Sequence, residues 1–422
     1  MANSSSILGL NSRNHLFQSR FNRRTGKEIA DSKLATKKFL DKYKILTPVL
    51  YGVFYQPSDV PKFNWGSLTE NFVIKPAEGY GGGGIVIIKK RVSGDEFMTM
   101  DRKIIGLDDL KLHVLDILEG HYSIHGLAGT AFIEERIMIH PLFRRFTYQG
   151  TPDVRVIVFN KIPVMAMLRL PTAESAGKAN LHQGAIGVGV DIASGKTTYG
   201  VWNDQLIKLI PGKNLRIAGL AIPFWDQILL TSIKIQAKLV NLGYMAVDFV
   251  IDQVRGPMVL ELTARPGLRI QIANLAGLRR RLERIEGVEV DELDKGVRIA
   301  KDLFGLRPRG KKRDELAVFE TVEVYADNKK RVKIDAKVDT GAYRTSIDRN
   351  LAKKLGLLKK KNVLWTTHFE SALGKENRPI IGLTLWIGGQ KILTTASVAS
   401  RGDLKTKIII GRRDMKGFII KP

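Results

Sequence analysis

A glycine-rich turn between two apolar segments is the stretch of the sequence that most clearly suggests chemistry. Phe72–Ile74 predicts a strand leading to Lys75, and Ile85–Ile88 predicts a returning strand. The turn between them, Glu78–Gly84, contains five glycines. Its backbone N–H groups can approach phosphate oxygens because no Cβ atoms intervene, and Lys75 adds a positive charge. The turn returns as a strand and lacks the G-K-[ST] ending, so it is neither a Walker A loop nor a dinucleotide fingerprint; the alternative is a plain hairpin tip.

Two acidic residues occupy neighbouring predicted strands later in the chain. Asp248 lies in the run MAVDFVID, Glu261 lies in MVLELT, and a Gly-Pro turn joins the two runs. Carboxylates on adjacent strands can face the same side of a sheet, where their oxygens suit Mg²⁺. The pattern predicts a magnesium site, and the alternative for each residue is an ordinary salt bridge.

Other charged residues fall on segments that could surround the same chemistry. The segment AFIEERIMIHP predicts a strand that ends in Glu134 and Glu135, where backbone groups suit an adenine and a carboxylate suits a ribose. The strand predicted for TPDVRVIVFN carries Arg155, and Arg169 follows on MLRLP before a polar loop. Lys33 stands at the start of a predicted helix.

A seam divides the chain into two unequal parts. The segment FGLRPRGKKRDE, residues 304–315, combines Pro, Gly and a charge run after a helical pattern from about residue 291 to 306. Strands alternate with helices before the seam, and short β segments dominate after it. We expect an N-terminal arm over residues 1–30, an α+β domain over 31–305, a linker over 306–316 and an all-β domain over 317–422.

Composition restricts the class of protein. The 422 residues suggest two or three domains, and the absence of cysteine excludes disulfides, thiolate zinc sites and a cysteine nucleophile. No signal peptide or membrane-spanning run is evident, so we expect a cytoplasmic protein. The net charge of +26 fits anionic ligands or contact with a nucleic acid or ribosome, although no zinc finger, RRM or KH pattern is present.

Together these motifs resemble the ATP-grasp superfamily, and more narrowly the alpha-L-glutamate ligase-like (RimK-related) proteins. The resemblance rests on ILGLNSRN, DSKLATK, FVIKPAEGYGGGGI, DVRVIV, NLHQGAIGVGVD and LELTARPGLRIQIANLAGL, and covers about residues 5–305. It implies ATP and Mg²⁺ as ligands and an acyl-phosphate route to an amide, with an amino acid, plausibly glutamate, joined to a peptide, protein or small carboxylate acceptor.

The resemblance also implies roles for single residues. Nucleotide-binding positions would be Lys33, Lys75, Gly81, Gly82, Gly83, Glu134, Glu135 and Ile137. Arg155 and Arg169 would steady the transferred phosphoryl group or a substrate carboxylate, and Asp248 and Glu261 would bind the metal. Thr263 departs from the usual Glu-x-Asn pattern of the metal strand, which puts a second metal ion in doubt.

The segment KVDTGAYRTSID, residues 337–348, poses a separate question, because peptidase chemistry at an Asp-Thr-Gly triplet needs two carboxylates. With Ile409-Ile410-Gly411-Arg412, this segment resembles the retropepsin-like aspartic peptidases, in the branch labelled ATP-dependent zinc protease and found beside RimK-type ligases. The resemblance implies a small β-barrel with Asp339 as catalytic residue and the second aspartate supplied by another copy, hence a homodimer. No tetrahedral zinc set can be assembled from the sequence.

We therefore expect an α+β ATP-grasp domain followed by a small all-β retropepsin-like barrel. The expected function is a carboxylate–amine ligase fused to a peptidase-like domain that trims the product. One alternative is a non-catalytic ATP-binding module with a dimerising barrel, which Thr263 favours. The other is a basic RNA- or ribosome-associated protein.

Overall fold

The computed structural model describes residues 6–78, 82–123, 126–306, 315–327, 330–371, 374–401, 406–415 and 418–421. The chain forms two compact units. The first comprises residues 1–190 and 195–285, and the second comprises residues 191–194 and 286–422. No helix among the described residues has the length and apolar character needed to cross a membrane.

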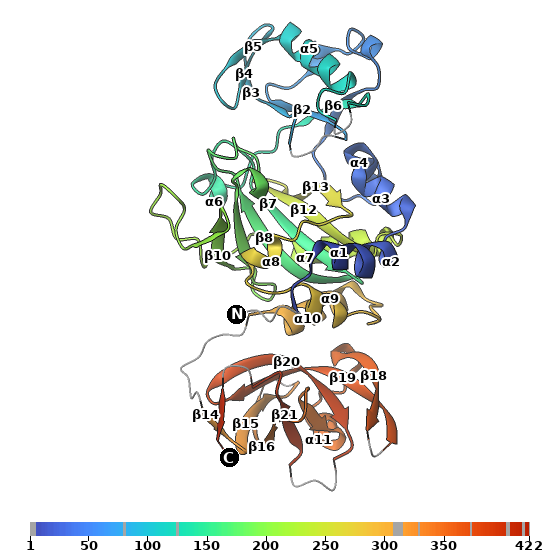
Figure 1. Cartoon of the computed structure of the whole chain (residues 1–422), viewed down its shortest axis with the longest axis vertical. Helices are drawn as coiled ribbons and strands as arrows, with labels where there is room; N and C mark the ends of the chain where they lie inside the picture. The colour runs from blue at the N-terminus through green and yellow to red at the C-terminus, as the bar shows by residue number, and fades with distance from the viewer. Residues whose placement is uncertain are drawn as a thin grey trace. The chain divides into compact units, whose positions relative to one another are not determined.

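The first sheet of unit 1 carries the glycine turn (Figure 1). Its six strands are all antiparallel, in the order β1 (Leu50–Phe54), β6 (Ala131–Glu135), β2 (Phe72–Pro76), β3 (Val86–Ser93), β4 (Glu96–Thr99) and β5 (Ile104–Gly106). Helix α5 (Leu107–Leu118) buries Leu110, Val114 and Ile117 in the same core as Phe72 and Ile74. The strands expected around the turn and before Glu135 are confirmed.

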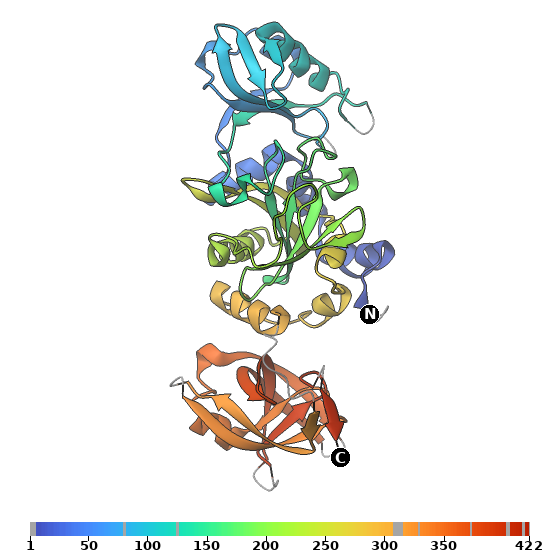
Figure 2. The same cartoon turned by 90° about the vertical axis from the view of Figure 1, so that its left-hand side faces the viewer.

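The second sheet of unit 1 carries the paired acids. Its seven strands are antiparallel, in the order β11 (Gln205–Ile207), β10 (Thr197–Trp202), β9 (Ile186–Val190), β8 (Ile162–Leu170), β7 (Asp153–Phe159), β12 (Tyr244–Asp252) and β13 (Gly256–Thr263). Figure 2 shows α7 (Trp225–Lys238) and α8 (Ile270–Ala273) on opposite sides of this sheet. Every residue of β12 is buried, which fits a strand covered on both faces.

The N-terminal segment, whose sequence is polar and weakly patterned, is helical. It forms α1 (Leu10–Ser12), the π-helix η2 (Arg13–Gln18), α2 (Ser19–Phe21), α3 (Arg24–Asp31) and α4 (Lys33–Lys42). Phe17 is buried against Phe159 and Tyr244. The buried Asn22 side chain donates a hydrogen bond to the Tyr244 carbonyl oxygen and accepts one from the Tyr244 N–H group. Five short helices complete the described part of unit 1: η3 (Pro57–Asp59), η4 (Trp65–Ser67), α6 (Pro141–Arg144), η5 (Leu181–Gln183) and α9 (Arg279–Glu283).

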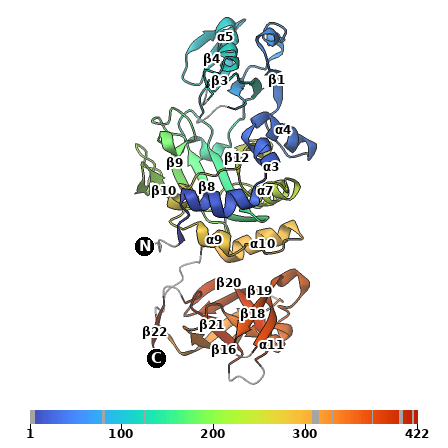
Figure 3. The same ribbon diagram turned by 45° about the vertical axis from the view of Figure 1, so that its right-hand side comes forward.

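Unit 2 contains a closed β-barrel (Figure 3). The strands run in the order β15 (Phe319–Tyr325), β16 (Arg331–Asp339), β21 (Ile408–Gly411), β17 (Ser346–Asp348), β20 (Gln390–Ala399) and β19 (Gly374–Ile387), and β19 pairs with β15 to close it. Strand β18 (Val363–Ser371) extends from β19, and β14 (Glu315–Ala317) pairs with β22 (Ile419–Lys421). Helices α10 (Leu293–Phe304) and α11 (Arg349–Lys354) also belong to unit 2. Most of the expected linker lies outside the described residues.

Candidate functional site

Three lysines gather around one buried carboxylate beside the glycine turn. Ser32 caps α4 by accepting a hydrogen bond from the Ala35 N–H group, and this places Lys33 and Lys37 one turn apart on the helix. Lys37 Nζ lies 2.7 Å from Glu134 Oε2, and Lys75 Nζ pairs with Glu134 Oε1. The Lys33 Nζ group donates to the Ala77 carbonyl oxygen over 3.2 Å.

The charges of this lysine cluster (Lys33, Lys37, Lys75 and Glu134) do not cancel. Burial alone would raise the pKa of Glu134, but the charges of Lys75 and Lys37 hold it below its ordinary value. Burial lowers the pKa of both Lys33 and Lys37, although nearby carboxylates oppose the shift. Within the cluster three cations surround one fully buried carboxylate, and the carboxylates of Glu261 and Glu78 also act on Lys33 from outside it.

The described end of the glycine turn lies beside a fourth lysine. Gly82 and Gly84 have φ values of +78° and +70°, which residues other than glycine rarely adopt. The Lys178 side chain passes so close to Gly82 that a Cβ there would lie 3.2 Å from Lys178 Cδ. His113 Nε2 lies 2.9 Å from the Gly84 carbonyl oxygen and anchors the end of the turn to α5. Gly83 is described, whereas Gly81 lies outside the described residues.

A second charged group crosses the seven-stranded sheet. The register places Asp153 opposite Arg169, and Asp248 opposite both Arg155 and Glu261. Arg155 binds Asp248 through two hydrogen bonds of 2.7 and 2.6 Å, and Arg169 binds Asp153 through two of 2.5 and 2.6 Å. Arg169 Nη2 also donates to Asp248 Oδ2 over 2.7 Å. The arginine cluster (Asp153, Arg155, Arg169 and Asp248) is thus balanced in charge.

The two aspartates of the arginine cluster titrate in opposite directions. Burial raises the pKa of Asp153 to about 6, although Arg169 opposes the shift. Burial also acts on Asp248, but Arg155 and Arg169 together hold its pKa below the ordinary value. Asp248 therefore stays charged to a lower pH than Asp153 does.

The fit of these residues to Mg²⁺ is partial. Glu261 accepts no hydrogen bond from the described residues, and the Thr263 hydroxyl is buried without a partner on the same strand. Asp248 lies opposite Glu261, but both of its oxygens already bind guanidinium groups. Within the described part of the chain, no three His, Asp or Glu side chains form a metal-binding group. Two carboxylates and one hydroxyl suit a metal that takes its remaining ligands from phosphates.

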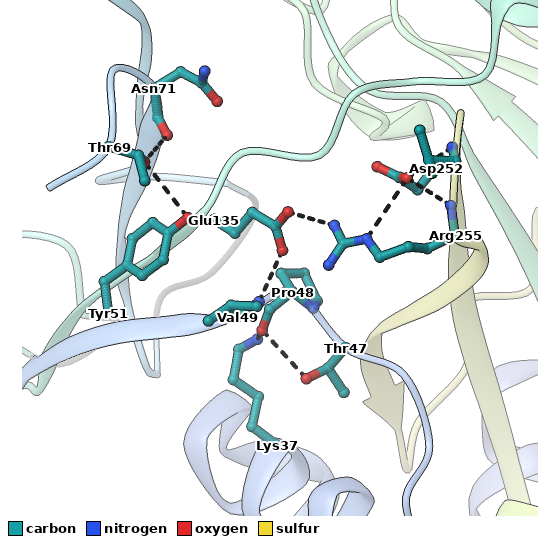
Figure 4. Close-up of polar contacts among 11 residues, drawn as sticks. Lys37, Thr47, Pro48, Val49, Tyr51, Thr69, Asn71, Glu135, Asp252 and Arg255 are labelled. Atoms are coloured by element: carbon teal, nitrogen blue, oxygen red, sulfur yellow. Dashed lines mark hydrogen bonds and ion pairs between the residues drawn. The ribbon is translucent and has the colours of Figure 1, made fainter.

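Glu135 is engaged elsewhere, as Figure 4 shows. Its Oε2 accepts a hydrogen bond of 3.1 Å from the Val49 N–H group, and its Oε1 pairs with Arg255 Nη2. Arg255 Nε lies 3.7 Å from Asp252 Oδ1. Ile137 is buried with Val250 and Met258. Glu135 therefore links β6 to the turn between β12 and β13.

Asp339 ends β16 in the barrel of unit 2. Its register partner on the parallel strand β21 is Gly411, and a Cβ at Gly411 would lie 2.5 Å from the Arg344 backbone. The N–H groups of Gly341 and Ala342 donate to Asp339 Oδ1 over 2.9 and 3.3 Å. The two segments singled out in the sequence are thus adjacent.

These arrangements can be compared with known proteins. A family model described as sugar-transfer associated ATP-grasp matches residues 12–287. The chain belongs to the sugar-transfer associated ATP-grasp family. This confirms the ATP-grasp part of the expected resemblance, while the narrower glutamate ligase-like group stays a prediction. No curated protein matches the chain.

Solved structures similar to this ATP-grasp chain are distant. The ATP-grasp ligase PsnB, solved with a minimal precursor, is 14% identical with a TM-score of 0.34, covering 63% of this chain and 62% of PsnB. D-alanine–D-alanine ligase from Bacillus anthracis, solved with ATP, is 17% identical with a TM-score of 0.33, covering 65% and 66%. The Simian Foamy Virus protease is 18% identical with a TM-score of 0.18, covering 25% and 98%. The chain thus spans about three fifths of PsnB.

Sequence reasoning gave no role to three charged residues of the ATP-grasp unit. Lys37 follows Lys33 by one helical turn, a spacing that predicts a shared face. Asp153 stands two residues before Arg155 and points to the same side of the sheet. No local signal marks Lys178, because its contact with Gly82 depends on how the loop after β8 folds back.

Proposed function

We propose that this ATP-grasp chain is an ATP- and Mg²⁺-dependent carboxylate–amine ligase. One observation carries the proposal: three lysines, Lys33, Lys37 and Lys75, gather at the base of a glycine turn. Phosphoryl transfer depends on positioning and on neutralising charge, and a triphosphate is an anion that such lysines can hold. The family match extends over both the lysine and the arginine clusters.

The proposed reaction has two steps. An acceptor carboxylate oxygen bonds to the γ-phosphorus of ATP and ADP leaves; an amine nitrogen then bonds to the acyl carbon, loses a proton, and phosphate leaves. Lys33, Lys75 and the turn around Gly82 and Gly83 would hold the phosphates. Glu134, Glu135 and Ile137 would lie near the adenine and ribose, although Glu135 already binds Arg255.

The second cluster would act on the transferred group and the metal. Arg155 and Arg169 would steady the phosphoryl group or the acceptor carboxylate. Glu261 and Asp248 would hold Mg²⁺, which neutralises charge on the phosphates when bound. Thr263 offers a hydroxyl where an amide is usual, so we expect the site to bind a second metal ion more weakly.

ADP release tests the ligase proposal. Purified protein with Mg²⁺ and ATP would be assayed against a panel of amino acids and carboxylate acceptors, including sugar-linked carboxylates because of the family's description. One stimulating pair, lost in Lys75→Ala and kept in Lys90→Ala, would support a ligase; Lys90 is an exposed lysine on β3. ATP binding without stimulated ADP release would favour the non-catalytic module.

For the barrel we propose a retropepsin-like peptidase activity that trims the ligase product. Its support is the Asp339 carboxylate, held by two loop N–H groups beside Gly411. One carboxylate is half of a site in which two share a proton, so a homodimer would supply the partner. Product length in Asp339→Asn and wild-type reactions tests this, and unchanged length would reject it.

RNA binding that falls steeply with salt would favour the nucleic-acid alternative.

A further inference from the structure

Glu134 has more positive partners than one carboxylate needs. Lys37 and Lys75 bind its two different oxygens, and the Glu134 side chain is only 2% exposed. One lysine is enough to balance the charge of one carboxylate. The second lysine is therefore not needed to neutralise the charge of Glu134.

The two lysines are held differently. Lys37 is 9% exposed, and its Nζ also donates to the Pro48 carbonyl oxygen over 2.7 Å (Figure 4). Lys75 is 17% exposed and, within the described part of the chain, its ammonium group is paired with Glu134 alone. Lys75 also stands on the strand that leads directly into the glycine turn. Lys37 is thus fixed by two acceptors, whereas Lys75 has one and lies next to the turn.

We propose that Lys37 is a fixed counter-ion for Glu134, and that it allows Lys75 to exchange Glu134 for a nucleotide phosphate. The proposal rests on the proposed function, in which this site binds ATP. Lys37 is a positioning residue in this scheme: it acts on Lys75 through Glu134 and does not touch the nucleotide.

The physical reason is the high free energy of an unpaired buried charge. If Lys37 were absent, transfer of Lys75 to a phosphate would leave the buried Glu134 carboxylate without either of its two ion-paired lysines. With Lys37 present, the same transfer leaves one ion pair at Glu134 and creates a second between Lys75 and the phosphate. Lys37 therefore reduces the competition between Glu134 and the nucleotide for Lys75.

Nucleotide affinity tests this competition. Calorimetric titration of Mg²⁺-ATP would compare the wild type, Lys37→Met, Lys75→Met, the double variant Lys37→Met with Glu134→Gln, and Lys38→Met as an exposed control on the same helix. We expect Lys37→Met to weaken binding about tenfold, since Glu134 then holds Lys75 as its sole partner. The double variant should recover most of this loss because the neutral amide that replaces the carboxylate does not compete for Lys75. Adding Glu134→Gln to Lys75→Met should restore no binding, because the lysine itself is gone.

A second measurement needs no nucleotide. Labelling with an amine-reactive ester, followed by mass spectrometry of the Lys75 peptide, reports how tightly Glu134 holds Lys75. We expect slower labelling of Lys75 in Lys37→Met and unchanged labelling in Lys38→Met.

The outcomes separate the two proposals. Wild-type protein that binds no nucleotide would overturn the proposed function, and the phosphate exchange with it. Nucleotide binding that needs Lys75 but is unaffected by Lys37→Met would overturn the counter-ion role and leave the function standing. A double variant that stays as weak as Lys37→Met, or Lys75 labelling equal to that of the wild type, would also overturn it.

Discussion

The lysine cluster and the arginine cluster both neutralise buried carboxylates, but they do so with different side chains and different geometry. In the lysine cluster one buried carboxylate pairs with two lysines, while in the arginine cluster two arginines face two aspartates. A lysine is a point charge on a flexible stem, and an arginine binds a carboxylate through two fixed hydrogen bonds. The first arrangement leaves charge available for a ligand, and the second fixes geometry.

The comparison assigns the clusters different roles. An anion can enter the lysine cluster without breaking every ion pair, because Glu134 has two partners. A cation that uses Asp248 must share it with Arg155 and Arg169. We therefore expect variants of the arginine cluster to lose more stability than variants of the lysine cluster, whose main effect should be on nucleotide binding.

Removing Asp248 should give the largest effect. Asp248→Ala would leave Arg155 and Arg169 buried with only Asp153 between them, and loss of one partner from a buried ion pair costs about 3–5 kcal/mol. Urea denaturation of the variant measures this loss in the free energy of unfolding. Glu261→Gln is the matched control, because Glu261 is partly exposed and accepts no hydrogen bond from the described residues. Equal losses in the two variants would contradict the comparison.

Lys75→Met should show the opposite balance. Glu134 keeps Lys37 in this variant, so we expect a loss of about 1 kcal/mol or less in unfolding free energy. Nucleotide binding should fall by about a hundredfold, since a charge-assisted contact to phosphate is lost. Denaturation and titration on the same sample give both numbers. A large stability loss with intact binding would show that Lys75 is structural.

The sequence predicted the elements better than the contacts. β6 ends at Glu135 as expected, β2 and β3 flank the turn, and Asp248 and Glu261 lie opposite each other on adjacent strands. These follow from local apolar patterns and strand pairing. That Asp248 binds two arginines, and Glu135 binds Arg255, could not be inferred, because each contact joins residues 79 to 120 positions apart. The buried Phe17 was missed for the same reason.

The pH dependence of stability should separate the two clusters. The lowered pKa of Glu134 adds stability above its ordinary pKa, and this is lost as the pH falls through the folded-state value. Asp153, with its pKa raised to about 6, acts in the opposite sense: its contribution is complete at low pH and declines as the pH rises through about 6. The unfolding free energy of Glu134→Gln should therefore deviate from the wild type as the pH falls below the ordinary Glu pKa of 4.5, and that of Asp153→Asn as the pH rises from 3.8 through about 6, with opposite slopes. Slopes of the same sign would refute the assignment.

Breaking the ion pair between Glu135 and Arg255 should change stability least, because this pair is more exposed than the ion pairs of either cluster. Arg255 is 35% exposed and Glu135 is 21% exposed, so water already screens the pair. We expect Arg255→Ala to reduce the unfolding free energy by about 0.5–1 kcal/mol, and Arg24→Ala, at a pair whose arginine is 93% exposed, to change it less. If Glu135 contacts the ribose, releasing it from Arg255 should alter affinity for ATP relative to a nucleotide without ribose hydroxyls. Thermal unfolding and competitive titration on the two variants test both points, and unchanged nucleotide preference would limit Glu135 to joining β6 to the turn between β12 and β13.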